Sequence, residues 1–344
     1  MRFAVQVLQI AFTFIGTVVG AGFASGQEIL QFFTQYGRIG TITIIIASLL
    51  MIWLGTKLML VAKQIGAASY EDMNIHLFGE KMGKGVTVFL LINLFCVAAV
   101  MLAGAGSIFK EHLQLPFQFG LIITMILSYI VLLKGIDAII SINTVVVPFM
   151  LLFTAMIVFA SLNTPQAEQF LTLTTDTSAA RAWIAPFIYA AYNLALAQAV
   201  LVPLSHAVES RTVIKWGGIV GGLGIGLMLV GGHFAMSANM PVVLQFEIPM
   251  GMIVVHLGRV FQTLFLLVIF TEIFTTFIAE LYGLTVQLQQ RTAIPTKWII
   301  IVLLLATYLI SQIGFKNLLT TLYPLFGMIS MIWFVMMVWK RNAV

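Results

Sequence analysis

Ten long apolar stretches, separated by short polar connectors, constrain the fold of this 344-residue chain more than any other feature. A hydrocarbon core about 30 Å thick is crossed by a helix of roughly 20 apolar residues. Charged residues make up 8% of the chain, whereas a soluble domain carries about 25%. We therefore predict an all-α polytopic membrane protein and exclude a soluble enzyme, a disordered chain and a nucleic-acid-binding protein. The predicted spans are 4–35, 38–62, 84–109, 117–134, 138–162, 181–207, 213–236, 250–284, 296–313 and 317–339.

The basic residues predict how the spans are oriented, because cytoplasmic loops carry an excess of Lys and Arg. With the N-terminus inside, twelve of the seventeen basic residues fall on the cytoplasmic side and five on the other. This distribution predicts that both termini are cytoplasmic, and it agrees with ten spans. The predicted cytoplasmic set is Arg2, Lys57, Lys63, Lys81, Lys84, Lys134, Arg211, Lys215, Arg291, Lys297, Lys340 and Arg341.

The connectors leave no room for a soluble domain, so we treat 1–344 as one transmembrane domain. Ten spans divide into a first repeat of about 4–162 and a second of about 181–339. Because each half contains an odd number of spans, the second half runs inverted relative to the first. Inverted repeats place a binding site at mid-membrane, between the first helices of the two halves, and these helices are commonly broken. We therefore expect broken helices in spans one and six.

Span one carries four glycines, at positions 16, 20, 22 and 26. Each glycine inside a helix costs about 1 kcal/mol relative to alanine, so the cluster weakens the helix at mid-membrane. An unwound segment there exposes carbonyls to a cation and amides to an anion. Close packing through GxxxG pairs is the alternative. It does not account for Ser25, Gln27 and Glu28, which follow at once, and a broken helix is favoured.

Span six contains two prolines, Pro186 and Pro203, and each disturbs a helix by about 3 kcal/mol. Hydroxyl and amide groups lie between them, and Tyr189 and Asn193 share one face because they are four residues apart. Hydrogen bonds between helices are the alternative role for each residue taken singly. Their combination in this span favours a site for a small polar solute. The polar residues are Tyr189, Tyr192, Asn193 and Gln198.

Span eight contains a carboxylate, Glu272, and an acid inside a membrane helix is a functional hypothesis by default. Thr275 and Thr276 follow it by three and four residues. One carboxylate and two hydroxyls offer oxygen ligands to a small cation, or a proton site if Glu272 titrates. Glu28 is a further candidate for proton or ion coupling, in the site or in an outer gate. Glu280 is expected at the membrane interface.

Other polar residues carry less information. His233 is expected to be a hydrogen-bonded structural residue, and Cys96 a small packing residue. The sequence shows neither a catalytic metal spacing nor a phosphate-binding glycine loop. No cofactor is therefore expected apart from Na⁺ or H⁺ as a coupling ion, and active transport would use an ion gradient.

The run from Gly16 to Glu28, together with Tyr192-Asn193 and the Val202-Pro203-Leu204 segment, resembles the YkvI-type bacterial membrane proteins. These are similar in turn to the amino acid–polyamine–organocation transporter superfamily, which has the LeuT-like five-plus-five inverted fold. The resemblance covers nearly the whole chain. It implies a multi-pass protein of the cytoplasmic (inner) membrane of a bacterium.

The wider resemblance implies a sodium site and a solute site. The sodium ligands would be carbonyls of Gly16 and Val19 and hydroxyls of Thr275 and Thr276. Glu272 departs from the family pattern, which leaves sodium, a proton or both in competition as the coupling ion. An amino-acid carboxylate would meet amides around Gly20, Ala21 and Gly22. Its side chain would rest near Tyr189 and Tyr192, and Ser25 and Asn193 complete the solute-binding candidates.

The sequence thus predicts an ion-coupled symporter of a small polar solute, an amino acid or a related compound, which works by alternating access. A non-transporting ligand sensor or channel-like receptor subunit, as in the similar spore-germination receptors, is the alternative. We do not expect an enzyme. The expected partners are the solute and the lipid bilayer, not nucleic acid, and the oligomeric state is left open.

Overall fold

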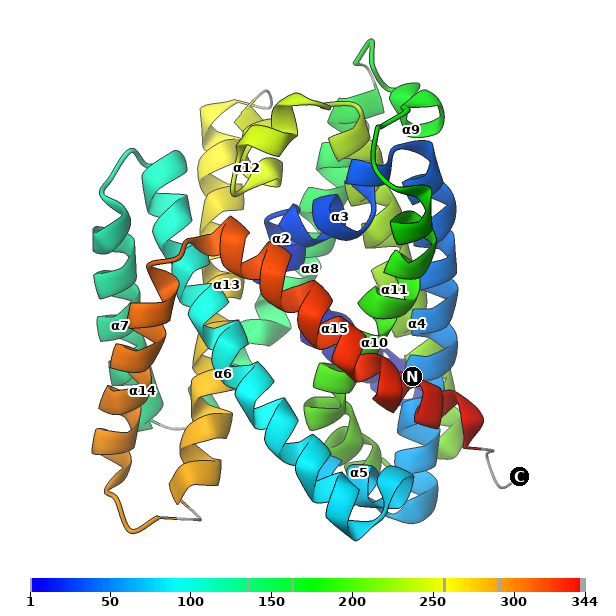
Figure 1. Ribbon diagram of the computed structural model, residues 1–344, viewed down its shortest axis with the longest axis vertical. Helices are drawn as coiled ribbons and strands as arrows, with labels where there is room; N and C mark the ends of the chain where they lie inside the picture. The colour runs from blue at the N-terminus through cyan, green and yellow to red at the C-terminus, as the bar shows by residue number, and fades with distance from the viewer. Residues whose placement is uncertain (1, 135–136, 163, 256–257, 290–291, 341–344) are drawn as a thin grey trace.

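The protein is a bundle of helices, and its computed structural model describes residues 2–134, 137–162, 164–255, 258–289 and 292–340 (Figure 1). No strand occurs in these ranges. Six helices are long and apolar enough to cross a membrane by length and composition. They are α4 (Arg38–Ile65), α6 (Glu80–Glu111), α10 (Ala179–Ala207), α11 (Arg211–Ser237), α13 (Arg259–Gln289) and α15 (Phe315–Trp339).

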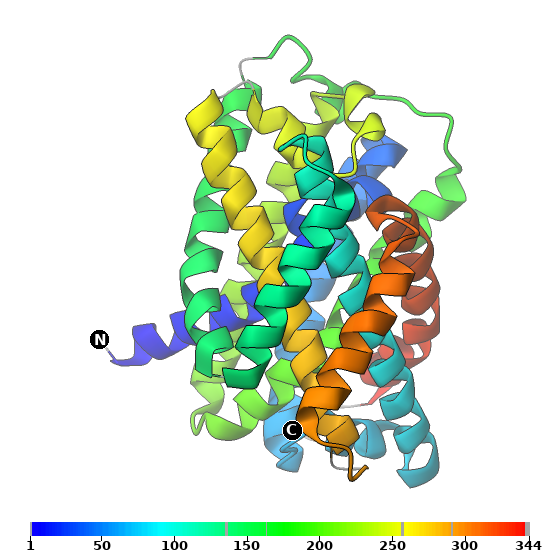
Figure 2. The same ribbon diagram turned by 90° about the vertical axis from the view of Figure 1, so that its left-hand side faces the viewer.

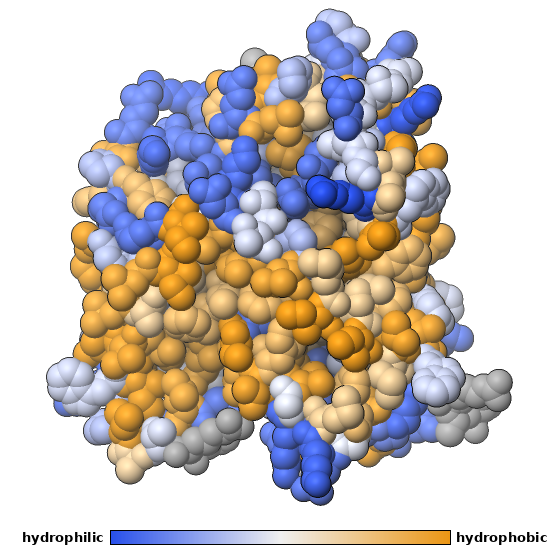
Figure 3. Space-filling view, viewed as in Figure 1, coloured by the Kyte–Doolittle hydropathy of each residue, from blue (hydrophilic) through white to orange (hydrophobic). Residues whose placement is uncertain are grey.

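Shorter apolar helices occupy the other four predicted ranges. Apolar side chains dominate the middle of the face seen in Figure 3, and hydrophilic ones gather toward its top and bottom. This distribution is that of a helical membrane protein, since only elements with internally satisfied backbones can face lipid. The shorter helices are α1 (Arg2–Val18), α7 (Phe117–Lys134), α8 (Asp137–Leu162) and α14 (Thr296–Ser311).

Short elements occupy the two ends of the bundle. The lower end in Figure 1 carries α5 (Tyr70–Phe78), which begins with a capping box between Ser69 and Asp72. The opposite end carries α9 (Gln169–Thr172), η2 (Val242–Gln245) and α12 (Pro249–Val254) (Figure 1). Of the predicted cytoplasmic set, Arg291 and Arg341 lie outside the described residues.

Span eight begins later than predicted. The sequence predicted a span over 250–284, but residues 249–254 form the separate short helix α12, and α13 begins at Arg259. Gly258 explains the boundary, because its φ of +100° is left-handed and cannot continue an α-helix.

The predicted break in span six is absent, because α10 runs without interruption from Ala179 to Ala207. Pro186 is the eighth residue of the helix and Pro203 the fifth from its end, and each removes one hydrogen bond from the ladder. Between Pro186 and Pro203 the helix keeps its internal bonds and packs against α4 and α15. Proline was therefore not sufficient to break this helix.

Span one is divided, in contrast, into α1, α2 (Ala21–Ala24), α3 (Gln27–Phe32) and η1 (Thr34–Tyr36). Helix α1 runs obliquely, and its first turns project from the side of the bundle (Figure 2). It packs on α11 through glycines, since a Cβ on Gly217 would lie 2.5 Å from Ile10 and one on Gly221 2.9 Å from Phe14. The glycine-rich span seven is thus a close-packing surface, as small residues in membrane helices often are.

Gly40 allows α4 to approach the end of α3 closely, which gives a test of this packing. A Cβ there would lie 2.1 Å from the carbonyl oxygen of Phe33, and a backbone atom cannot rotate away. We expect Gly40→Ala to lower the free energy of unfolding by about 1–3 kcal/mol. Thermal melting in detergent measures the effect. Gly85→Ala is the matched control, because its Cβ would meet nothing within 4 Å, and equal melting temperatures for both variants would contradict the packing.

Candidate functional site

The helical hydrogen-bond ladder is interrupted between α1 and α2. Gly20 has extended backbone angles (φ −93°, ψ −170°), and its amide bonds to the Val18 carbonyl at 3.0 Å instead of continuing the ladder. Within the described residues, no backbone amide bonds to the carbonyls of Gly16, Thr17 or Val19. Buried backbone groups are nearly always paired, so these oxygens are available to a ligand.

The amides just after the interruption are also without backbone partners. Helix α2 is fully buried, and its amides at Ala21, Gly22 and Phe23 donate to no carbonyl in the described part of the chain. Ser25, predicted as a solute contact, uses its hydroxyl locally, since it donates to the Gly22 carbonyl at 3.0 Å and accepts from the Gln27 amide at 3.3 Å. It therefore stabilises the turn from α2 to α3.

The turn after α2 is anchored from outside the segment. The Met250 amide of α12 donates to the Ser25 carbonyl at 2.9 Å. Gly26 has a φ of +84°, and a Cβ on it would lie 2.7 Å from the Met250 side chain. Helices α2 and α3 are thus held against α12, while α1 is joined to them only across the interruption.

Glu28 is brought to the centre of the bundle at the start of α3. It is 2% exposed, and its Oε1 accepts a hydrogen bond of 3.0 Å from Nδ2 of Asn193. Its Oε2 lies over Gly22, where a Cβ would be 2.8 Å from that oxygen and 3.2 Å from the Tyr323 ring. Glycine at position 22 is therefore required for this carboxylate to fold back over α2.

Three buried tyrosine rings surround the carboxylate. Tyr189, Tyr192 and Tyr323 all lie close enough to Glu28 to interact with it electrostatically. The rings of Tyr192 and Tyr323 have centroids 4.5 Å apart. The edges of Phe32 and Phe33 hold Tyr189 in place, at centroid distances of 5.5 and 5.2 Å. The sequence predicted Tyr189, Tyr192 and Asn193, and the structure adds Tyr323 of α15.

Glu280, which is expected at the membrane interface, lies on α13 near buried tyrosines of α10 and α15. It stands nine residues before the end of α13, about 13 Å along the helix, and is partly buried. It interacts electrostatically with Tyr192 and Tyr323. Helix α13 continues to Gln289, five residues beyond the predicted end of span eight.

Thr276, one of the two predicted cation ligands of α13, faces the interrupted segment. The Thr276 hydroxyl lies 4.0 Å from the point where a Cβ on Gly20 would stand. Thr275 donates its hydroxyl proton to the Glu272 carbonyl at 3.1 Å, so its lone pairs are left for a ligand. Glu272 is 3% exposed and, four residues before Thr276, shares its helix face. The α-carbon of Gly16 faces Val147 of α8.

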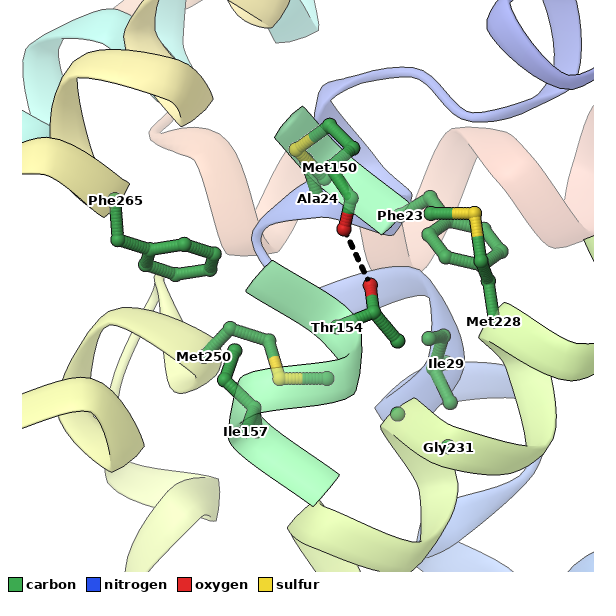
Figure 4. A pocket seen from close by; sticks show the side chains of 11 residues that line it. Phe23, Ala24, Ile29, Met150, Thr154, Ile157, Met228, Gly231, Met250 and Phe265 are labelled. Atoms are coloured by element: carbon green, nitrogen blue, oxygen red, sulfur yellow. Dashed lines mark hydrogen bonds between the residues drawn. The ribbon is translucent and has the colours of Figure 1, made fainter. Parts of the chain in front are cut away.

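A small apolar cavity lies beside α2, on the side of α8, α11 and α12 (Figure 4). Its volume of about 10 Å³ is near the room that one water molecule needs. Thr154 adds no free polar group to it, because its hydroxyl donates to the Met150 carbonyl at 2.8 Å. The cavity is therefore a gap in packing next to the site. It is lined mainly by Phe23, Ala24, Met150, Met228, Met250 and Phe265.

His233 is a structural residue, because hydroxyl groups engage both of its ring nitrogens. Thr41 donates to the Phe170 carbonyl at 2.6 Å, so its oxygen must accept from Nε2 of the ring, 2.9 Å away. Nδ1 then accepts from Thr34 at 3.0 Å. This arrangement satisfies a neutral imidazole and joins α11 to η1, α4 and the α9 segment.

Comparisons with known sequences relate the chain to a bacterial membrane protein. No family model matches the chain. It is 39% identical over 330 residues to the uncharacterized membrane protein YkvI of Bacillus subtilis, covering 94% of this chain and 92% of that one. It is 26% identical over 319 residues to the uncharacterized protein YyaD of the same organism, covering 92% and 91%.

Two solved structures share the fold. The structure of MhsT in complex with L-phenylalanine has a TM-score of 0.68 at 16% identity, over 97% of this chain and 89% of that one. The Eremococcus coleocola manganese transporter has a TM-score of 0.58 at 14% identity, over 96% and 78%. At these identities the likeness concerns the fold alone, which is that of the LeuT-like transporters.

The hydrogen bond between Asn193 and Glu28 can be tested through stability. Asn193→Ala removes the donor from a buried carboxylate, so we expect it to lower the free energy of unfolding by about 1–3 kcal/mol. Asn93→Ala is the matched control, since Asn93 is also buried but both of its amide atoms are unpaired. A thermal melt in detergent compares the two, and an equal loss in both variants would count against the bond.

Proposed function

The chain belongs to the family of the membrane protein YkvI, and on that premise we propose that it is an ion-coupled secondary transporter of a small polar solute, an amino acid or a related compound. Its solved structural neighbours are transporters rather than enzymes. The observation that carries the proposal is the interruption between Val18 and Ala21. It leaves backbone carbonyls and amides unpaired beside a buried cluster of polar side chains.

The proposed topology has ten membrane crossings, in two inverted halves of five, with both termini in the cytoplasm. Six long and four shorter apolar helices, one in each predicted span, support the crossings. The excess of basic residues on one side supports the orientation. The bacterial relatives support placement in the cytoplasmic membrane.

The proposed coupling ion lies between the interrupted segment and α13. Carbonyls of Gly16 and Val19 would supply two oxygens, and hydroxyls of Thr275 and Thr276 two more. Oxygen ligands suit a hard cation such as sodium. Glu272, on the same face as Thr276, would bind a proton in competition with that cation.

The way in which the segment is attached supports alternating access as the proposed mechanism. Helices α2 and α3 are fixed to α12 through the bond from Met250 to Ser25. Helix α1 is joined to them only through the two residues at which the ladder is broken. In the proposed mechanism α1 therefore tilts relative to the fixed α2 and α3, which changes the side of the membrane to which the site opens.

Removal of one threonine hydroxyl tests the cation site. We expect Thr275→Ala or Thr276→Ala to raise the sodium concentration for half-maximal binding by roughly tenfold, the equivalent of about 1.4 kcal/mol. Binding of radioactive sodium to the purified protein measures this. Thr285→Ala is the control, because Thr285 is also buried in α13 and donates to its own helix at Leu281. If neither Thr275→Ala nor Thr276→Ala changes the sodium concentration for half-maximal binding, the proposed site is refuted.

Competition between a proton and sodium is tested at Glu272. A proton on this carboxylate removes its attraction for sodium, so the wild-type concentration for half-maximal sodium binding should rise as the pH falls. We expect Glu272→Gln to flatten this pH dependence, because the amide does not titrate. The exposed acid Glu209 provides the control Glu209→Gln, which should retain the wild-type profile. An unchanged profile in Glu272→Gln would eliminate Glu272 as the titrating group.

A further inference from the structure

Three acids within the helices of the bundle lack basic partners. Lys84 and Glu80 form the one ion pair within 4.0 Å among the described residues, and it lies on the surface. Glu28, Glu272 and Glu280 have no such partner, and Glu28 is held by the hydrogen bond from the Asn193 amide. An unpaired charge in a low-dielectric interior is strongly unfavourable. A bound cation would supply the positive charge that these three carboxylates lack.

Glu28 is the acid that aromatic rings enclose. Its Oε2 lies against Gly22 and the ring of Tyr323, and Tyr192 packs on Tyr323. Tyr189 is the third ring, and it packs in T-shaped contacts against Phe32 and Phe33. The faces of aromatic rings carry negative potential and attract ammonium groups, most strongly where water is excluded. A carboxylate and three tyrosine rings together suit an organic cation.

Unused hydrogen-bonding groups point to the same kind of ligand. The Tyr189 hydroxyl lies within reach of the Glu28 carboxylate and the Tyr192 hydroxyl within reach of Tyr323, but neither makes a well-formed hydrogen bond, although both residues are almost completely buried. The amide group of Gln198, further along α10, is also unpaired. An ammonium group has N–H donors and no acceptor, so it needs oxygens around it. The carboxylate and hydroxyl oxygens near Glu28 meet that need.

The position of Glu28 argues against a solute carboxylate. The sequence predicted that an amino-acid carboxylate would meet the amides around Gly20, Ala21 and Gly22. In the structure the Glu28 carboxylate itself lies over Gly22. A second carboxylate in the same place would face it at a few ångströms, where like charges repel strongly in a buried site.

We propose that the solute is an organic amine without a free carboxylate, whose ammonium group binds Glu28 among Tyr189, Tyr192 and Tyr323. This inference rests on the proposed transport function and narrows its solute class. The apolar part of the amine lies against the rings, and the Asn193 amide holds the carboxylate in position. Glu272 and the threonines of α13 remain for the coupling ion.

Matched pairs of compounds test the solute class. Tyramine and tyrosine differ only in the carboxylate, as do isoamylamine and leucine. Binding of each compound to the purified full-length protein is measured in detergent with sodium present. We expect each amine to bind at least tenfold more tightly than its amino acid. Equal or tighter binding of the amino acids, or no binding of either amine, would overturn the inference.

Variants connect the binding to Glu28. We expect Glu28→Gln to weaken tyramine binding at least tenfold, while Glu209→Gln, on the exposed surface, leaves it unchanged. If Glu28→Gln does not fold, Tyr192→Leu replaces it, since it retains the acid and removes a ring. Folding is checked by gel filtration and by the melting temperature without ligand. Undiminished tyramine binding in the folded variant would contradict the role of Glu28 or of the rings.

The proposal and the transport function can fail separately. Amines that bind as expected but never enter proteoliposomes would leave the binding site in place and refute transport. Uptake of an amino acid, with no binding of amines, would support transport and refute the amine.

Discussion

A backbone that leaves its helix inside a membrane must find other partners for its carbonyls and amides, because lipid supplies none. This constraint acts at Val19 and Gly20, where the ladder of span one stops and restarts. The unpaired groups on either side are tolerated only where the protein or a ligand surrounds them. The buried helix α2, the Thr276 hydroxyl of α13 and the acid at the start of α3 all lie beside these unpaired groups.

The neighbours of the interruption divide it into a fixed and a movable part. A bond from α12 and the left-handed Gly26 hold α2 and α3, and Glu28 is fixed to α10 through Asn193. On the other side α1 depends on close glycine contacts with α11, which small shifts can change. A ligand that fills the space between these parts stabilises one arrangement over the other in proportion to its difference in affinity.

The membrane fold could be predicted from the sequence, because the length of each apolar run is set by the bilayer. The interruption of span one could also be predicted, since four glycines weaken a helix locally. The contact between Glu28 and Asn193 could not, because hydropathy does not fix which faces of distant helices meet. Tyr323 was missed for the same reason: a tyrosine in an apolar span has no local signal for a site. The predicted break in α10 was wrong because each proline there removes one backbone hydrogen bond without ending the helix.

Uptake into proteoliposomes tests the central claim, that the site around the interruption carries a solute across the membrane. Radiolabelled tyramine is added outside vesicles that contain the protein, with inward sodium and proton gradients imposed separately. We expect tyramine to accumulate inside the vesicles above its outside concentration with at least one gradient. An ionophore that dissipates that gradient should abolish the accumulation. Tyramine that binds the purified protein but accumulates under neither gradient would contradict it, and would make the chain a ligand sensor on a transporter scaffold.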